Sequence, residues 1–201
     1  MPGRTSTTRE PIVFAAVLAA GSSRRFGRHK LLEKVDGKPL VRHAAEIART
    51  VCGDRSILVT GYESAAVTAA AGDAPQFLIV NDRHEEGMGG SIALAARIVS
   101  HVADALVLLF ADQPLVTPRH VEALVRTWSG AQDQILATVF SGTVGPPVLF
   151  PSGAFDALAR LSGDTGARSV LRDPQFDLGT VPFEAAAIDI DTPADLERLR
   201  Q

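Results

Sequence analysis

Residues 12–27 of this 201-residue chain read IVFAAVLAAGSSRRFG, and this stretch indicates the architecture. Its first eight residues form a continuous apolar run, which is typical of a strand buried on both faces of a parallel sheet. The run leads into Gly21 and Gly27, and small residues there let backbone N–H groups approach a ligand closely. Because open parallel sheets bind ligands beyond the carboxyl ends of their strands, this loop is a candidate site.

Apolar runs and helical spacings alternate along the next hundred residues. Further strands are expected at residues 56–60, 76–80 and 105–110, and helices at 40–51, 63–71, 91–99 and 118–128. This alternation predicts an α/β fold with a mostly parallel sheet covered by helices on both faces.

The alternation loosens beyond Gly130. The expected elements there are strands at 134–140 and 148–150 around a Gly/Pro loop at 141–147, helices at 152–161 and 165–172, a strand at 179–181 or 187–190, and a short helix after Pro193. No linker or repeat is evident, so residues 11–201 are expected to form one domain after a flexible tail of residues 1–10.

The composition excludes several classes of protein. The formal net charge of −3 disfavours non-specific nucleic-acid binding, which needs an excess of Lys and Arg. Cys52 is the single cysteine, so no internal disulfide framework forms, and a reducing cytoplasm is the expected location. No apolar run approaches the roughly 20 residues of a membrane helix, so no membrane association is expected. The five histidines show no metal-ligand spacing.

The loop after the first strand is rich in cationic residues. Arg24, Arg25, Arg28 and Lys30 follow the small residues and suit a triphosphate cradle, the alternative being a surface turn with solvated arginines. The loop is neither a Walker P-loop nor a dinucleotide fingerprint, because it contains no Gly-Lys-Ser/Thr and no Gly-x-Gly-x-x-Gly.

Acidic residues at two places suggest a metal site. Asp112 follows the apolar run at 105–110, where an unpartnered carboxylate is costly, and Mg²⁺ prefers carboxylate, water and phosphate oxygens. Asp189 and Asp191 alternate as residues on one face of a strand do. They are either solvent-exposed or gathered by a cation, and Asp191 is also a candidate cap for the last helix.

A third loop, residues 81–91, follows the strand at 76–80. Asn81, Gly87 and Ser91 lie in it, and Ser91 is expected to be a helix N-cap or a ligand contact from a helix N-terminus. A hydrolase elbow around Ser91 is disfavoured because no strand runs directly into the serine.

These motifs together resemble molybdenum cofactor cytidylyltransferases, a branch of the MobA-like NTP transferase domain family. The resemblance runs from about residue 12 to 199 and rests on residues 18–27 with 30–32, residues 36–40, Asn81 with Gly87, Met88 and Ser91, residues 112–114, residues 145–150, residues 163–168 and residues 189–193. Ala20 stands where guanylyltransferase relatives carry glycine, which favours CTP as the nucleotide.

The resemblance implies a three-layer, Rossmann-like nucleotidyltransferase fold. It also implies transfer of CMP from CTP to the terminal phosphate of molybdenum-bound molybdopterin, with release of pyrophosphate. Lys30, Arg24 and Asp112 would be catalytic, and Asp112 and Asp191 (or Asp189) would hold Mg²⁺ or Mn²⁺. The implied nucleotide- and acceptor-binding residues are Leu18, Ala19, Ala20, Gly21, Ser22, Ser23, Arg24, Lys30, Asn81, Gly87, Ser91, Asp164 and Arg168.

Other functions remain open at this level. A sugar phosphate or another phosphorylated acceptor would suit the same fold, and so would a non-catalytic chaperone that hands cofactor to a molybdenum enzyme. A transient complex with a molybdenum hydroxylase or its accessory protein is an expected partnership.

Overall fold

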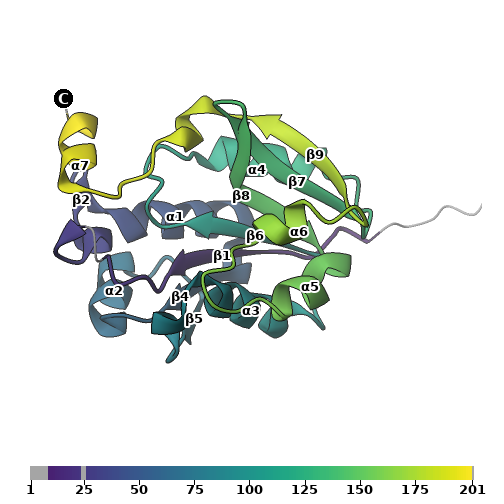
Figure 1. The fold of residues 1–201 in the computed structure, drawn as a ribbon, viewed down its shortest axis with the longest axis horizontal. Coiled ribbons are helices and arrows are strands. Elements are labelled where there is room, and N and C mark those ends of the chain that lie inside the picture. Colours follow the sequence, from purple (N-terminus) through teal and green to yellow (C-terminus); the bar gives the residue numbers. More distant parts are fainter. Residues whose placement is uncertain (1–8, 24–25, 201) are drawn as a thin grey trace, which may run out of the picture.

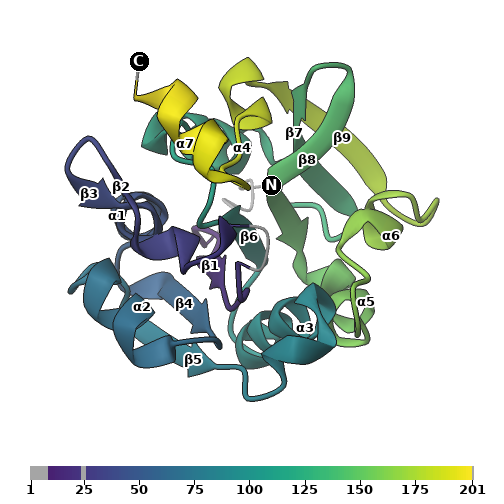
Figure 2. The ribbon, with the colours of Figure 1, turned by 60° about the vertical axis from the view of Figure 1, so that its left-hand side comes forward.

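A central sheet of seven strands carries helices on both faces in a computed structural model that describes residues 9–23 and 26–200 (Figures 1 and 2). The strands are β1 (Val13–Ala19), β2 (Lys34–Val35), β3 (Lys38–Pro39), β4 (Ser56–Thr60), β5 (Phe77–Val80), β6 (Ala105–Phe110), β7 (Gln134–Phe140), β8 (Thr143–Pro151) and β9 (Asp177–Pro182). The sheet order is β5-β4-β1-β6-β8-β7-β9, and β2 pairs with β3 in a separate ribbon. Only β8 runs antiparallel to its neighbours in the sheet, which confirms the predicted α/β architecture.

The helices follow the strands in the predicted order. They are α1 (Leu40–Cys52), α2 (Ser64–Ala71), α3 (Met88–Val99), α4 (Pro118–Thr127), α5 (Phe155–Ala159), α6 (Arg168–Leu171) and α7 (Pro193–Leu199). The first, second and fourth match their predicted ranges to within a residue or so, whereas α3 begins three residues early, at Met88. The predicted helices at 152–161 and 165–172 are shorter, because 3₁₀ and turn geometry takes up their ends.

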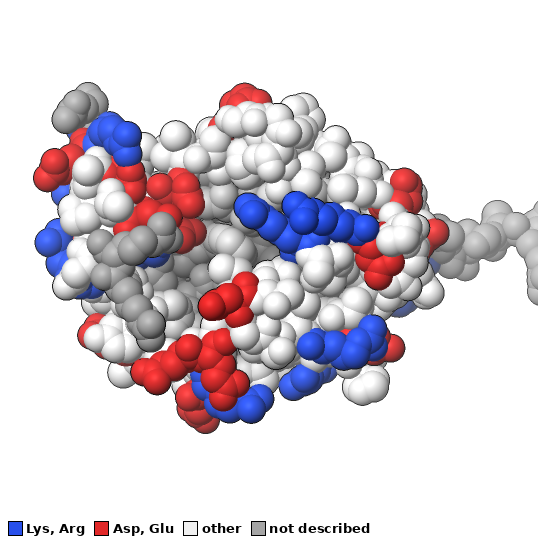
Figure 3. All heavy atoms as spheres, in the orientation of Figure 1, with Lys and Arg blue, Asp and Glu red and all other residues white. Residues whose placement is uncertain are grey.

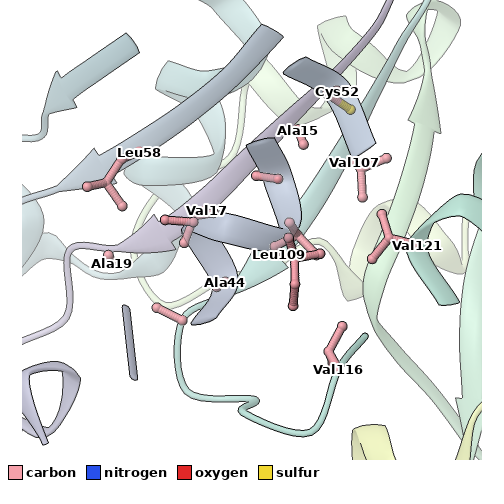
Figure 4. Close-up of a cluster of buried hydrophobic side chains, with 14 of the residues drawn as sticks. Ala15, Val17, Ala19, Ala44, Cys52, Leu58, Val107, Leu109, Val116 and Val121 are labelled. Carbon is pink, nitrogen blue, oxygen red and sulfur yellow. The ribbon is translucent and has the colours of Figure 1, made fainter. Parts of the chain in front are cut away.

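Strand alternation divides the aliphatic core between the two faces of the sheet. Ala15 and Val17 of β1 and Val107 of β6 point toward α1, α2 and α4. Figure 4 shows them in one cluster with residues of α1 and α4. Ala16 of β1 and Leu106 of β6 point the opposite way, toward α3 and α5. The central strands are therefore buried on both faces, as their continuous apolar sequences predict.

The expectation that residues 76–80 form a buried strand is wrong in one respect. The strand exists, but β5 is at the edge of the sheet, and Phe77, Leu78 and Val80 are 50%, 48% and 46% exposed. An apolar run predicts that a strand forms, but it does not predict where that strand lies in the sheet. That position depends on pairing with strands far away in the sequence.

Most of the Gly/Pro segment predicted as a loop at 141–147 is strand, because residues 143–147 belong to β8 and only residues 141–142 form a turn. Ser141 and Gly142 both have positive φ angles, of 47° and 72°, which suits a tight turn between β7 and β8. The pairing register shifts between Ala137 and Thr138, opposite the two prolines at 146–147. A bulge tolerates prolines because the ladder hydrogen bonds are interrupted there.

The strand predicted at either 179–181 or 187–190 is found at the first position, within β9. Residues 187–190 are not a strand, because a 3₁₀ turn at Glu184–Ala187 leads into an extended connection. The prediction that Asp189 and Asp191 lie on one face of a strand is therefore wrong, because these residues are not in a strand.

At the other end, residues 1–8 of the predicted tail lie outside the described residues, while Arg9 pairs with Asp104 at 2.9 Å. Among the described residues, no helix has the length and apolar character needed to cross a membrane.

His120 is a buried histidine that makes stability depend on pH. Its ring stacks on Phe183, and its Nε2 donates to Thr138 Oγ1 at 2.8 Å, because that hydroxyl donates its own hydrogen to the carbonyl oxygen of Pro147. Burial lowers the pKa of His120 from 6.5 to about 4.

We expect this histidine to reduce stability as the pH falls below about 6.5. In that range His120 is protonated in the unfolded chain, whereas in the folded chain it stays neutral until about pH 4. The free energy of unfolding therefore decreases as the pH falls. Between pH 7.5 and 5.0 the decrease should be about 2 kcal/mol, measured by urea denaturation. His120→Gln should lose this pH-dependent part, and His101→Gln, at an exposed position, should retain it. Equal slopes in all three proteins would contradict the assignment.

Candidate active site

A pocket of about 460 Å³ opens where β1 and β6 end. These strands are parallel neighbours at the centre of the sheet, so the loops that follow them meet at one edge. Figure 3 shows this hollow with acidic atoms beside it, and with basic atoms in the region that Figure 1 labels α6. The sequence-predicted residues in its lining are Leu18, Ala19, Ala20, Gly21, Ser22, Ser23, Lys30, Gly87, Ser91, Asp112, Asp164 and Asp191.

Lys30 links the two carboxylates that were predicted as metal ligands. Its Nζ donates to Asp112 Oδ2 at 2.8 Å and to Asp191 Oδ1 at 3.0 Å. The Lys30 side chain is only 14% exposed, so these are charge-assisted hydrogen bonds in a partly desolvated place. Lys30 thereby joins two residues that lie 82 and 161 positions from it in the sequence, and all three line the pocket.

The electrostatics of this cluster favour a charged lysine. Burial lowers the pKa of Lys30, but the charges of Asp112 and Asp191 and the hydrogen bonds to them outweigh burial, so the pKa is raised overall. Asp189 lies within range of the same cluster, and its pKa is raised by burial and by the charges of Asp112 and Asp191. The cluster therefore holds negative charge that a further cation would stabilise.

The C-terminal segment presents Asp191 to the pocket, and Asp189 is not part of the lining. The backbone N–H of Ile190 donates to the Asp112 carbonyl oxygen at 2.9 Å, which ties this segment to the loop after β6. Thr192, and not Asp191, caps α7, in a capping box with Asp195. The prediction that Asp191 is a helix cap is therefore wrong, and its carboxylate faces Lys30 instead.

The donor set at Asp112 and Asp191 fits a magnesium or manganese ion. Asp112 Oδ1 is buried without a hydrogen-bond partner in the described residues, so it has an acceptor position to offer. Among those residues, no three His, Cys, Asp or Glu side chains are grouped to hold a metal by themselves. Mg²⁺ is commonly held by one or two carboxylates together with waters and substrate phosphates, so two suffice.

The first loop supplies the opposite wall. Ser23 has a positive φ of 52°, and its hydroxyl is buried without a hydrogen-bond partner in the described residues, which leaves it available to a ligand. Of the four predicted cations, Lys30 lines the pocket, whereas Arg28 pairs with Glu33 and lies outside the lining. Arg24 and Arg25 fall outside the described residues.

Asn81, which follows β5, and Ser91 in the first turns of α3 form a buried pair. Asn81 Nδ2 donates to Ser91 Oγ at 3.0 Å, and Asn81 Oδ1 accepts from the backbone N–H of Arg83. Ser91 reaches the pocket lining and Asn81 does not, so Asn81 supports the wall from behind. The prediction of Ser91 as an N-cap is wrong, because α3 begins at Met88 and is capped by Gly87.

Residues 162–164 join the pocket through close contacts with Gly87 and Gly89 at the start of α3. The backbone N–H of Gly89 donates to the carbonyl oxygen of Gly163 at 2.9 Å. A Cβ on Gly87 would lie 2.3 Å from the carbonyl carbon of Gly163, so only glycine permits this approach. Asp164, the next residue, is thereby placed in the lining, whereas Arg168 begins α6 outside it.

We expect Gly89→Ala to disturb this contact strongly. The new Cβ would lie 2.7 Å from the backbone nitrogen of Ser162, so the segment that carries Asp164 must shift. Stability should fall by roughly 1–3 kcal/mol, measured by urea denaturation. Gly90→Ala is the matched control, because its Cβ would meet nothing closer than 3.5 Å and alanine favours the helix. Equal stability of the two variants would contradict the expected clash.

Five lining residues are not among the predicted site residues, although Leu31 and Met88 lie in the family motifs. The five are Leu31, His84, Glu85, Met88 and Phe110. His84 packs over Gly61 and meets the ring of Tyr62 edge-on, and Tyr62 in turn stacks on His29. In the sequence, only their position in the loop at 81–91 indicates that His84 and Glu85 could line the site. Neither residue has the spacing of a metal ligand.

Comparison with known proteins agrees with this geometry. The model of the MobA-like NTP transferase domain family matches residues 15–179. The chain belongs to this family. Among curated relatives, purine catabolism protein PucB of Bacillus subtilis is 33% identical over 96% of this chain and 98% of its own. Nicotine blue oxidoreductase of Paenarthrobacter nicotinovorans is 31% identical over 94% and 97%.

Other similarities cover the molybdenum branch and the solved structures. A probable molybdenum cofactor guanylyltransferase of Thermococcus sibiricus is 34% identical, over 56% of this chain and 54% of its own. The crystal structure of Rv0371c from Mycobacterium tuberculosis superposes with a TM-score of 0.82 and 28% identity, over 96% of this chain and 99% of that chain. The same protein in complex with manganese gives a TM-score of 0.75 and 26% identity, over 94% and 97%.

Membership of the MobA-like family makes this protein a nucleotidyltransferase with molybdenum-cofactor-related homologues. The matched range contains the pocket lining from Leu18 to Asp164 and ends before Asp191.

Proposed function

We propose that this MobA-like protein transfers CMP from CTP to the terminal phosphate of molybdenum-bound molybdopterin and releases pyrophosphate. The observation that carries the proposal is the junction of Lys30 with Asp112 and Asp191, directly beside the Gly21–Ser23 loop. One cation and two carboxylates beside backbone donors suit a reaction between two polyanions, in which charge must be neutralised and aligned.

The first loop and α3 would hold the nucleotide. Gly21, Ser22 and Ser23 line the pocket and offer backbone and hydroxyl donors to phosphate oxygens. Lys30 would offset charge on the triphosphate and on the leaving pyrophosphate, as would Arg24. Asn81 supports the wall that includes Ser91, near which base and ribose would lie.

Asp112 and Asp191 would hold Mg²⁺ or Mn²⁺. When bound, the ion would neutralise charge on the α-phosphate, as a Lewis acid does in phosphoryl and nucleotidyl transfer.

The acceptor needs no protein nucleophile because its phosphate is already an anion. One acceptor oxygen forms a bond to the α-phosphorus in line, and the bond from that phosphorus to the β-phosphate bridging oxygen breaks. The electron pair leaves with pyrophosphate. Asp164 lines the pocket and Arg168 begins the neighbouring helix α6. We assign this side of the pocket to the acceptor, whose phosphate Arg168 would bind.

CTP is the proposed nucleotide because of Ala20. This residue is buried in the loop and lines the pocket, where guanylyltransferase relatives carry glycine. A methyl group at this place would narrow the space for the base and favour a pyrimidine over guanine. We further propose a transient complex with a molybdenum hydroxylase or its accessory protein, to which the finished cofactor would pass.

A panel of nucleotides and acceptors tests this function. CTP, GTP, ATP and UTP are each combined with Mg²⁺ and with molybdenum-bound molybdopterin or a simple sugar phosphate, and released pyrophosphate is measured. We expect release with CTP and the molybdopterin acceptor. Release only with a sugar phosphate, or nucleotide binding with no release, would assign the protein to one of the alternative functions. Because one relative bears the name of an oxidoreductase, the assay contains no added oxidant or reductant.

A further inference from the structure

The ammonium of Lys30 and a divalent cation would use the same two carboxylates, those of Asp112 and Asp191. Lys30 Nζ lies 2.8 Å from Asp112 Oδ2 and 3.0 Å from Asp191 Oδ1, so it fills the space between the two carboxylates. Mg²⁺ binds oxygen at about 2.1 Å, so an ion that bridges Asp112 Oδ2 and Asp191 Oδ1 would occupy that same space. The two cations therefore compete for one position.

Displacing the ammonium without giving it a new partner is unfavourable. The Lys30 side chain is 14% exposed, and its ammonium donates to these two carboxylates. A lysine that loses both while it stays in the pocket becomes a poorly solvated charge beside a second cation. Metal binding to the nucleotide-free protein is opposed by this cost.

A bound triphosphate would offer the ammonium of Lys30 a new partner and so lower the cost of displacing it. Lys30 lines the pocket together with Ser22 and Ser23, so phosphate oxygens held by that loop would lie within reach of a flexible lysine side chain. The ammonium then exchanges carboxylate oxygens for phosphate oxygens and leaves the carboxylates to the metal.

We propose that Lys30 couples the two binding events: without nucleotide it blocks the metal position between Asp112 and Asp191, and a triphosphate opens that position by drawing the lysine away. This inference rests on the proposed function only in taking a nucleoside triphosphate as the ligand. Since coupling between sites is reciprocal, the metal must raise nucleotide affinity by the same factor as the nucleotide raises metal affinity.

The experiment measures Mn²⁺ affinity by the loss of the free-ion electron paramagnetic resonance signal. Wild-type protein is titrated with MnCl₂ alone and with MnCl₂ plus a CTP analogue whose α,β-bridge is methylene, after subtraction of Mn²⁺ bound to the analogue itself. We expect the analogue to raise the affinity of the wild-type site on the order of tenfold or more. Lys30→Met should bind Mn²⁺ alone on the order of tenfold more tightly than wild type, and the analogue should raise its affinity much less.

Lys34→Met is the matched control, because it removes the same charge from an exposed lysine four positions away, outside the pocket lining. Its Mn²⁺ affinity, with and without the analogue, should equal that of wild type. This result would show that the effect of Lys30→Met comes from the metal position and not from the change in net charge.

Lys30→Gln is the second variant, and circular dichroism verifies that each protein is folded. Unchanged Mn²⁺ affinity in both folded Lys30 variants would overturn the proposal, and would mean that the ion is held through Asp112 Oδ1 with the lysine in place. Absence of Mn²⁺ binding in every protein would also overturn it. Neither result depends on pyrophosphate release, so failure of the proposed transfer reaction is recognised separately.

Discussion

Asp112→Asn is expected to lower pyrophosphate release by about 10³-fold while the protein stays folded. The substitution keeps the shape of the side chain and removes its charge. It therefore weakens the hydrogen bond from Lys30 and takes away one of the two carboxylates that would hold the metal. Both losses act where charge develops between two polyanions, which is why the effect on turnover should be large.

The measurement is pyrophosphate release under single-turnover conditions, with thermal unfolding as the test of folding. Asp156→Asn is the control, because it makes the same change at an exposed position of α5 outside the pocket lining. It should retain wild-type turnover. Full activity of folded Asp112→Asn would remove Asp112 from the mechanism, whatever the nucleotide and acceptor.

Lys30→Met should reduce kcat/KM for CTP by roughly 10²–10³-fold, the second largest effect that we expect. The substitution keeps the length of the apolar stem and removes the ammonium that would otherwise bind phosphate oxygens. The two carboxylates then lose their shared partner and repel an incoming triphosphate more strongly.

If Lys30 blocks the metal position, Lys30→Met should change metal binding and catalysis in opposite directions. Mn²⁺ alone should bind more tightly, whereas CTP should be used less efficiently. A purely structural lysine would move neither quantity beyond the loss of stability, and Lys34→Met serves again as the control. Initial rates over a range of CTP and Mg²⁺ concentrations separate the two effects, and unchanged kcat/KM would exclude Lys30 from the nucleotide site.

The sequence was most informative where one local signal sufficed. The buried strands β1 and β6 could be predicted because their apolar runs are continuous, and a strand buried on both faces has few polar positions. The loops after them could be predicted as a site because strand ends of parallel sheets meet at one edge. Most residues assigned from the family motifs do line one pocket.

Prediction failed where the outcome depended on a partner far along the chain. The run at residues 76–80 has the same apolar character as the central strands, yet nothing in it indicates that β5 is at the edge. The prolines of β8 suggested a loop, because a bulge that accommodates them is defined only by the register with β7. Asn81 was assigned to the pocket, but its hydrogen bond to Ser91 holds it behind the wall.

By itself the sequence determined the α/β class, the place of the first loop and the presence of acidic residues after the apolar strands. Those features follow from hydrophobic periodicity and from residue types over short stretches. Only the tertiary structure decided that Asp191 rather than Asp189 lines the pocket, and that Lys30 lies between Asp191 and Asp112. The physical reason is distance along the chain: these groups come from three separate loops, and their contact exists only once the sheet, the Asp112–Ile190 hydrogen bond and the cap of α7 are all formed.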